Sequence, residues 1–234
     1  MTAAAAPAPR DEVPLRDAAT IVVVRRDGEH ARVLMGMRGA KAAFMPSKYV
    51  FPGGAVDPED AHTPLARPLE PRHRSRLVAD GASDGPAPDT LAAAALRELA
   101  EETGLIVGQP GACDWPGYAT RGLRPDAAGL IYAFRAITPA GRPRRFDARF
   151  FLLDAATLSC DPDDFSDACD ELSHLHWVAL EAAQALDLPF ITEVVLAELA
   201  QLLQGLPADA PLPSPATVPF FDNRTSQPRF RQIP

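Results

Sequence analysis

The stretch from Leu96 to Leu105 reads Leu-Arg-Glu-Leu-Ala-Glu-Glu-Thr-Gly-Leu, and its spacing constrains this chain more than any other feature. An α-helix turns by about 100° per residue, so that Glu98, Glu101 and Glu102 fall within roughly 100° of one another and form one carboxylate stripe. Gly104 is placed to end this helix in a left-handed conformation. An apolar stripe lies beside the carboxylates and allows that side of the helix to be buried: Ala92, Ala95, Leu96, Leu99 and Thr103. Three adjacent carboxylates repel one another unless a divalent cation joins them.

A glutamate-rich helix is more often a solvated face than a metal site, so the stripe needs a second signal. The stretch from Phe51 to Asp60, Phe-Pro-Gly-Gly-Ala-Val-Asp-Pro-Glu-Asp, provides that signal. Together the two stretches resemble the Nudix box, the pyrophosphohydrolase signature G-x5-E-x7-R-E-U-x-E-E-x-G-U, in which U is an apolar residue. Gly54 matches the first glycine, and the residues from Arg97 to Leu105 fill the second half of the signature.

The match departs from the family pattern at two points. Asp60 stands where the first glutamate is expected, and 36 residues separate Asp60 from Arg97 where the family usually has 7. If Asp60 does not reach Arg97 across this insertion, Glu59 is the alternative. An interrupted box that follows a run like the one from Phe44 to Gly54 resembles the subgroup that contains the peroxisomal coenzyme A diphosphatases.

The resemblance implies an α/β protein with a Nudix-type α/β/α sandwich around a mixed β-sheet. It also implies that Glu98, Glu101 and Glu102 bind Mg²⁺ or Mn²⁺, hard cations that prefer oxygen ligands. The carbonyl oxygen of Gly54 is implied as a further ligand. By the same resemblance Glu98 is the candidate general base, although the residue that serves as base differs among family members. Arg97 is the second catalytic candidate, because it is placed to hold the carboxylates in position.

The function that follows from this resemblance is metal-dependent hydrolysis. The linkage would be the pyrophosphate of a nucleoside diphosphate joined to another moiety, and coenzyme A and its thioesters are among the candidates. The alternative is a catalytically idle Nudix module that binds a nucleotide as a sensor or stabilises a partner protein. The intact carboxylates favour turnover over this alternative.

Apolar patterns predict the other elements. Strands are expected at 18–25, 32–38, 49–51, 130–137, 146–153 and 172–178. A second helix is expected from about 181 to 203, with a pause at Leu188-Pro189.

The length of 234 residues fits one decorated domain. We expect a flexible segment at 1–14, the Nudix domain at 15–206 and a Pro-rich tail at 207–234. Within that tail, Val218-Pro-Phe-Phe221 is too apolar for an idle linker and is expected to pack on the domain or on a second subunit. The insertion at about 61–88 is either a lid beside the site or a tolerated surface excursion.

Substrate-binding residues are sought where charge is concentrated. Arg142, Arg144 and Arg145 form the densest basic group together with Arg149, and guanidinium groups suit phosphates. An ordinary exposed loop is the competing interpretation. The acidic stretch before the last predicted strand offers Glu171, with Asp164 as the other candidate, as an additional carboxylate at the site.

Charge and composition restrict the partners. The net charge of −8 argues against nucleic-acid binding, and no apolar stretch approaches the roughly 20 residues that span a bilayer. Three cysteines without C-x-x-C spacing favour a reducing, cytoplasmic location. We therefore expect a small nucleotide-type diphosphate as substrate, no membrane partner, and a homodimer as the favoured assembly.

Overall fold

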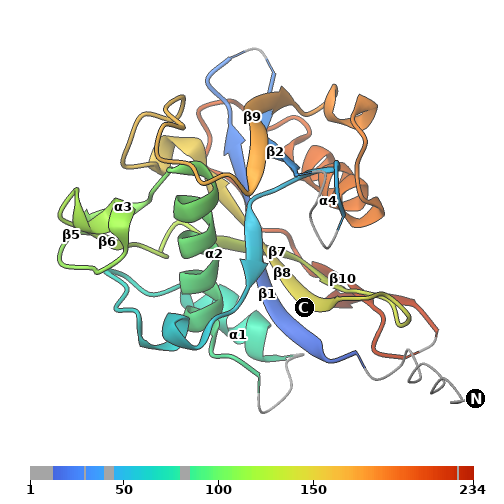
Figure 1. Ribbon diagram of the computed structural model, residues 1–234. Coiled ribbons are helices and arrows are strands. Elements are labelled where there is room, and N and C mark those ends of the chain that lie inside the picture. The colour runs from blue at the N-terminus through green and yellow to red at the C-terminus, as the bar shows by residue number, and fades with distance from the viewer. Residues whose placement is uncertain (1–12, 29, 40–44, 80–84, 226) are drawn as a thin grey trace, which may run out of the picture.

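The computed structural model describes residues 13–28, 30–39, 45–79, 85–225 and 227–234. Within these residues a nine-stranded mixed sheet forms the centre, in the order β11-β10-β7-β8-β1-β2-β3, with β4 paired to β1 and β9 paired to β2 (Figure 1). The strands are β1 (Leu15–Arg25), β2 (Arg32–Arg38), β3 (Tyr49–Val50), β4 (Gly53–Ala55), β7 (Ile131–Ile137), β8 (Arg145–Asp154), β9 (Leu172–Ala179), β10 (Val218–Asp222) and β11 (Arg229–Ile233). The sheet is mixed because β1 runs parallel to β8 and antiparallel to β2.

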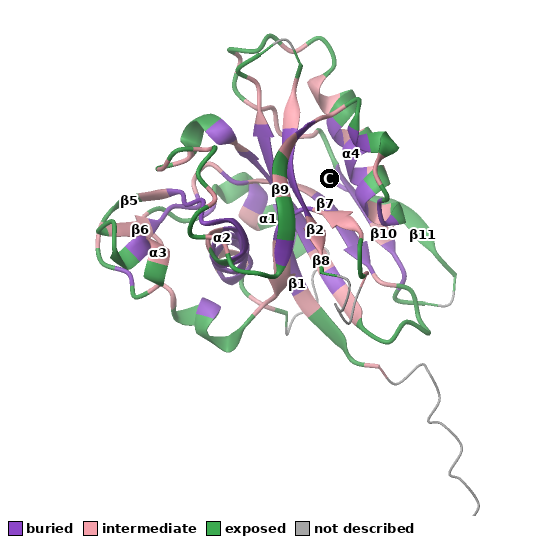
Figure 2. Ribbon diagram, turned by 45° about the horizontal axis from the view of Figure 1, so that its top comes forward, coloured by how far each residue is buried: buried purple, intermediate pink, exposed green. Residues whose placement is uncertain are grey.

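Two helices cover opposite faces of this sheet. The helix α2 (Pro88–Thr103) packs on one face, where Ile21 and Val23 of β1 join its apolar residues in one core. The helix α4 (Phe190–Leu203) packs on the other face, where Val22 and Val24 point. In Figure 2 the central strands and the sheet-facing side of α2 are buried. The predicted α/β/α arrangement is confirmed, and the nearly continuous apolarity of β1 reflects burial on both faces.

The smaller elements decorate this sandwich. They are α1 (Pro71–Ala79), α3 (Pro116–Ala119), the short pair β5 (Gly108–Pro110) and β6 (Leu123–Pro125), and the 3₁₀ turns η2 (Pro58–His62), η3 (Ala155–Thr157) and η4 (Ala183–Ala185). The predicted pause in the second helix is confirmed, because η4 is separated from α4 by residues that include Leu188 and Pro189. The strand predicted at 32–38 matches β2, and β1 begins three residues before its predicted start.

The region predicted as a tail contributes to the sheet. Its strand β10 pairs in parallel with β7, and β11 pairs with β10, so that Val218 and Phe220 lie in the α2-side core. The apolar Val218–Phe221 stretch thus packs on its own domain. The division of the chain at 14 and 207 stays a prediction, and most of the segment expected to be flexible, 1–12, lies outside the described residues.

The described part of the insertion is core structure. Leu69 and Leu77 are buried in the α2-side core, and α1 packs against α2. Arg76 donates to the carbonyl oxygens of Pro215 at 2.9 Å and Pro234 at 3.2 Å, which fastens α1 to the C-terminal strands. No helix among the described residues combines the length and the apolarity that crossing a membrane requires.

Candidate functional site

The two halves of the interrupted motif meet through backbone pairing. The strand β4 lies antiparallel to β1, with Gly53 opposite Thr20 and Gly54 opposite Ala19. A Cβ on Gly53, whose φ is +156°, would lie 2.6 Å from the carbonyl oxygen of Ala19, so that only glycine fits this close approach. The strand pairing therefore fixes the Gly-Gly backbone directly beneath α2.

The helix α2 carries the other half of the motif. Pro88 stands at its beginning and Gly104 ends it with φ +75°, as predicted. The predicted apolar stripe is fully buried: Ala92, Ala95, Leu96, Leu99 and Thr103 are all 0% exposed. The carboxylates are not arranged as a solvated face, because Glu98 is 9% exposed and Glu102 only 1%. Of the three, Glu101 is the open one, with a side chain that is 55% exposed.

Glu98 and Glu102 lie against the Gly-Gly backbone. A Cβ built on Gly54 would lie 2.6 Å from the carboxylate carbon of Glu98, so any side chain at position 54 would displace that carboxylate. The backbone N–H of Gly53 donates to Oε2 of Glu102 at 2.8 Å. The other oxygen of Glu102, Oε1, is buried and has no hydrogen-bond partner among the described residues. The structure thus brings Gly54 and the Glu98–Glu102 segment together across the insertion.

Arg97 binds the surrounding carboxylates. Its Nε donates to Asp60 at 2.8 Å, and its Nη1 donates to Glu98 at 3.0 Å and to Glu101 at 3.1 Å. Asp60 is 2% exposed and reaches Arg97 in spite of the insertion, whereas Glu59 is exposed. We call Asp60, Arg97, Glu98, Glu101 and Glu102 the glutamate cluster.

Burial raises the pKa values of two carboxyl groups in this cluster, those of Glu98 and Glu102. Burial, together with the negative charges of Glu101 and Glu171, raises the pKa of Glu98 to about 7 against the pull of Arg97. Burial also raises the pKa of Glu102 to about 8, although the Gly53 hydrogen bond and Arg38 act in the opposite direction. The pull of Arg97 on Glu98 and of Arg38 on Glu102 is therefore too weak to offset burial.

Glu171, predicted as an additional carboxylate, lies close enough to act on both buried glutamates. It raises their pKa values, and it accepts a hydrogen bond of 2.5 Å from Arg38 at the end of β2. Asp164 is exposed and caps its own turn by accepting from the Ser166 N–H at 3.0 Å. Arg38 is a site residue that the sequence analysis missed, because its partners are more than 60 residues away along the chain.

The predicted arginines lie elsewhere on the sheet. Arg145 pairs with Leu15 of β1, four positions from Ala19, which is roughly 13 Å along the strand from the register of Gly54. Arg142 and Arg144 are exposed in the turn between β7 and β8. The structure does not bring these three side chains to the glutamates, and their role in substrate binding stays a prediction.

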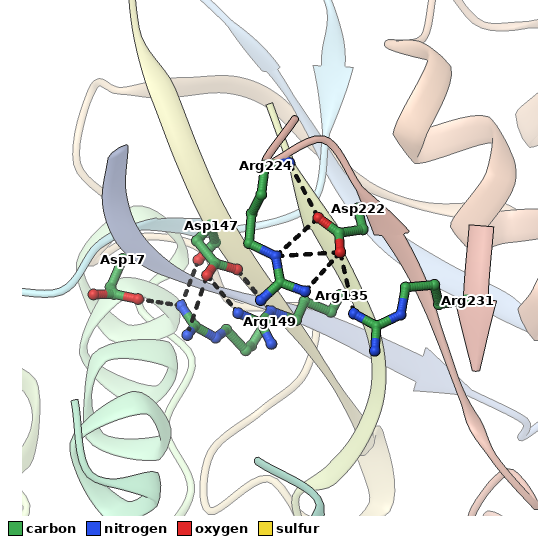
Figure 3. A network of polar contacts seen from close by, with 7 residues as sticks. All are labelled: Asp17, Arg135, Asp147, Arg149, Asp222, Arg224 and Arg231. Carbon is green, nitrogen blue, oxygen red and sulfur yellow. Dashed lines mark hydrogen bonds and ion pairs between the residues drawn. The ribbon is translucent and has the colours of Figure 1, made fainter. Parts of the chain in front are cut away.

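Arg149 belongs instead to a second group of ionised side chains, which we call the sheet network (Figure 3). Its members are Asp17, Arg135, Asp147, Arg149, Asp222, Arg224 and Arg231. Arg135 donates to both oxygens of Asp147, at 2.9 and 2.7 Å, and Arg149 bonds Asp17. Hydrogen bonds from Arg224 hold the pKa of Asp222 far below its usual range. The pairs of Asp17 and Asp147 join β1, β8 and β7, and the pair between Asp222 and Arg231 joins β10 to β11.

The glutamate cluster offers oxygen atoms, which are the ligands that a hard cation prefers. Its donors are carboxylate oxygens beside the Gly54 backbone, and the orphaned Oε1 of Glu102 is a buried oxygen that needs a partner. In the arrangement seen here, no group of three or more His, Cys, Asp or Glu in the described part of the chain is placed to hold one ion. The reason is visible in the contacts, since Glu98 and Glu101 turn towards Arg97.

Two cavities are prominent in the molecule. One, of about 460 Å³, lies between α4 and the sheet, where Phe134, Phe150 and Leu199 line it, and it contains no residue of the motif. The other, of about 370 Å³, adjoins the glutamate cluster and is lined partly by Arg97 and Glu101. The second cavity is therefore the one connected to the candidate chemistry.

This fold and site consist of a mixed sheet whose Gly-Gly strand lies under a glutamate-bearing helix, as the sequence motif predicted. No protein-family model matches the chain. The chain is 30% identical over 184 residues to the Caenorhabditis elegans protein designated nudix hydrolase 7, and the match covers 70% of this chain and 51% of that protein. It is also similar to the solved structure of a NUDIX hydrolase from Alicyclobacillus acidocaldarius, with 29% identity, a TM-score of 0.61, and coverage of 80% of this chain and 91% of that chain.

These comparisons support the Nudix hydrolase family, and they confirm the predicted Nudix-type mixed α/β fold. The chain spans about half the length of the curated relative, 51%. Neither relative's name specifies a substrate. The resemblance to the coenzyme A diphosphatase subgroup is therefore not confirmed by either comparison.

Proposed function

We propose that this protein hydrolyses the pyrophosphate linkage of a nucleoside diphosphate joined to a second moiety. The observation that carries this proposal is the convergence of the Gly54 backbone with two buried glutamates, Glu98 and Glu102. Two carboxylates in such a place cost free energy unless they are protonated or bind a cation, and this kind of cost is typical of functional sites. The similarity to named Nudix hydrolases in sequence and in fold supports the same reaction.

The proposed cofactor is Mg²⁺ or Mn²⁺. Glu98, Glu101 and Glu102 would hold it with the carbonyl oxygen of Gly54. When bound, the cation supplies charge neutralisation on the two phosphates and lowers the pKa of attacking water. It also supplies the positive charge that the buried carboxylates lack, in agreement with the raised pKa values of Glu98 and Glu102.

The reaction itself is a displacement at phosphorus. A water oxygen forms a bond to one phosphorus atom, the bond from that atom to the bridging oxygen breaks, and two phosphomonoesters result. Glu98 is proposed to accept the proton that the water loses. Arg97 is proposed to hold Glu98 and Glu101 in position from the opposite side, since it contacts both and is itself anchored by Asp60.

The proposal is tested with a panel of substrates that share the linkage: coenzyme A, an acyl-coenzyme A, ADP-ribose, NADH and oxidised nucleotides. Coenzyme A compounds come first because the run preceding Gly54 resembles that subgroup. Products are identified in the presence of Mg²⁺ or Mn²⁺. We expect two phosphomonoesters from at least one compound.

The matched variants are Glu102→Gln and Glu59→Gln. The first removes a charge from the buried cluster and is expected to lower kcat by at least about 100-fold. The second changes an exposed glutamate of η2, next to Asp60, and is expected to act like the wild type. Full activity in Glu102→Gln would remove the metal role, and binding of a nucleotide without product would favour the idle module.

A further inference from the structure

The cavity between α2 and α3 is continuous with the glutamate cluster. Its volume of about 370 Å³ lies in the range of about 300–1,000 Å³ that small-molecule sites occupy. The helix α2 supplies one wall, with Arg97 and Glu101 at the edge that faces the candidate reaction centre. A ligand held in this cavity would therefore extend from the place where the pyrophosphate is proposed to be cleaved.

The opposite wall comes from the segment around α3. Trp115 and Pro116 line it, and the Trp115 ring packs edge-on against Tyr118 with ring centroids 5.5 Å apart. Trp115 is half-buried, whereas Tyr118 is completely buried. The indole is thus supported from behind and keeps part of its surface towards the cavity.

The third wall is the loop before β9, which contributes Asp167 and Cys169. The backbone N–H of Cys169 donates to the carbonyl oxygen of Glu101 at 2.9 Å, so this loop is tied to α2. Arg121 pairs with Asp167 at 3.0 Å and donates to the carbonyl oxygen of Gly117 at 3.1 Å, which ties the loop to α3. The cavity is preformed by these contacts.

The chemistry of the lining selects the ligand. The walls offer an indole surface and a proline ring, and they offer the carboxylates of Glu101 and Asp167 as hydrogen-bond acceptors. Two carboxylates against the single guanidinium of Arg97 in the lining disfavour a phosphate inside the cavity, whereas a flat neutral ring with N–H donors satisfies both surfaces. We propose that this cavity binds the nucleobase of the substrate, with Trp115 as the stacking residue. This inference rests on the proposed function for the identity of the substrate.

The first test measures binding without turnover. Cys169 lines the cavity, and its alkylation by iodoacetamide is followed by peptide mass spectrometry, with the half-buried Cys160 as internal reference. We expect AMP at ten times its dissociation constant to slow Cys169 alkylation by about 10-fold. Ribose 5-phosphate, which has the same phosphate and no base, is expected to leave the rate unchanged. Equal protection by both compounds, or protection by neither, would overturn the inference.

The second test separates affinity from chemistry. Trp115→Leu keeps apolar contact with the core. For the substrate that the panel identifies, we expect this variant to have a KM raised by about 10-fold and a kcat within about 3-fold of wild type. Trp115→Phe keeps an aromatic ring and should restore most of the affinity. Trp177→Phe is the control, because Trp177 lies outside the cavity and donates to the carbonyl oxygen of Pro162.

The two proposals fail in different ways. An unchanged KM in a well-folded Trp115→Leu variant would overturn the nucleobase site and leave the hydrolase standing. A wild-type protein that hydrolyses no member of the panel would remove the proposed function. The protection of Cys169 by AMP would then still decide whether the cavity binds a base.

Discussion

Two groups of charged side chains, each with a buried centre, have opposite balances of positive and negative charge. In the glutamate cluster a single guanidinium, that of Arg97, contacts three carboxylates, and Glu102 beside it has an oxygen without a partner among the described residues. In the sheet network four arginines face three aspartates, and Asp147 and Asp222 each pair with two guanidinium groups. The pKa values follow this difference, since burial raises that of Glu102 to about 8 while hydrogen bonds from Arg224 lower that of Asp222.

The difference separates structural from functional use of charge. A network that satisfies itself joins strands and needs nothing from outside. A cluster with surplus carboxylates is incomplete and is stabilised by an added cation. The predictions that follow test this distinction, and they start with the largest expected effect.

The sheet network should be important for stability. Asp147→Ala removes a buried carboxylate that pairs with two buried guanidinium groups, those of Arg135 and Arg149, and is expected to cost about 3–5 kcal/mol of unfolding free energy. Asp163→Ala breaks the more exposed pair with Arg25 and should cost less than about 1 kcal/mol. Urea denaturation measures both. Equal costs for the two variants would contradict a structural role for the sheet network.

The glutamate cluster should be important for turnover. Glu98→Gln is expected to lower kcat by at least about 100-fold, equivalent to about 2.7 kcal/mol of transition-state stabilisation. Asp222→Asn, a change of the same kind in the sheet network, should leave kcat within about 3-fold. Steady-state kinetics on the substrate found in the panel provide the measurement. A comparable loss in both variants would show that the two groups are not functionally distinct.

Cations should stabilise the protein only through the glutamate cluster. At pH 8, Mn²⁺ at 100 times its dissociation constant is expected to raise the unfolding free energy by about 2.7 kcal/mol. Thermal unfolding with and without the ion detects this as a higher Tm. Glu102→Gln should lose most of the response, whereas Glu59→Gln should keep it. An undiminished response in Glu102→Gln would place the ion elsewhere.

The pH dependence of the chelated protein should have a defined sign. Because burial raises the pKa of Glu98 to about 7 and of Glu102 to about 8, from 4.5, the folded state holds these protons more tightly than the unfolded state. Their contribution to stability is therefore complete below pH 4.5 and is lost as the pH rises through 7 and 8.

Between pH 5 and pH 8 the expected loss is several kcal/mol relative to a variant with glutamine at both positions, because each pKa unit corresponds to about 1.4 kcal/mol. Urea titrations at several pH values in the presence of a chelator measure it. The lowered pKa of Asp222 acts with the opposite sign, since its contribution is lost only as the pH falls below the usual carboxyl range. A chelated protein that gains stability from pH 5 to pH 8 relative to the variant would contradict the prediction.

Local patterns in the sequence predicted the parts of the fold that depend on periodicity. The bounds of β2, the burial on both faces of β1 and the end of α2 at Gly104 all follow from residues that are close in the chain. The approach of Gly54 to Glu98 was predicted from the family motif. The separation of the two residues along the chain could not have predicted it, because the insertion between them is long.

The parts that were missed depend on distant partners. Arg38 is joined to Glu171 across 133 positions, and neither residue stands in a pattern that points to the other. Arg149 looked like part of a surface cluster beside Arg145, but it lies further along β8, opposite Ala19 of β1, where it is buried next to Asp17. The strands β10 and β11 were hidden by the prolines around them.

The contacts of Arg76 have a consequence for the order in which a newly made chain can mature. Its guanidinium bonds carbonyl groups 139 and 158 positions further along, so the α1 segment leaves the ribosome long before its partners exist. At about 5–20 residues per second, the wait is roughly 7–30 s. During that interval the nascent α1 segment depends on water, or on a chaperone, to solvate a charge that the finished protein buries.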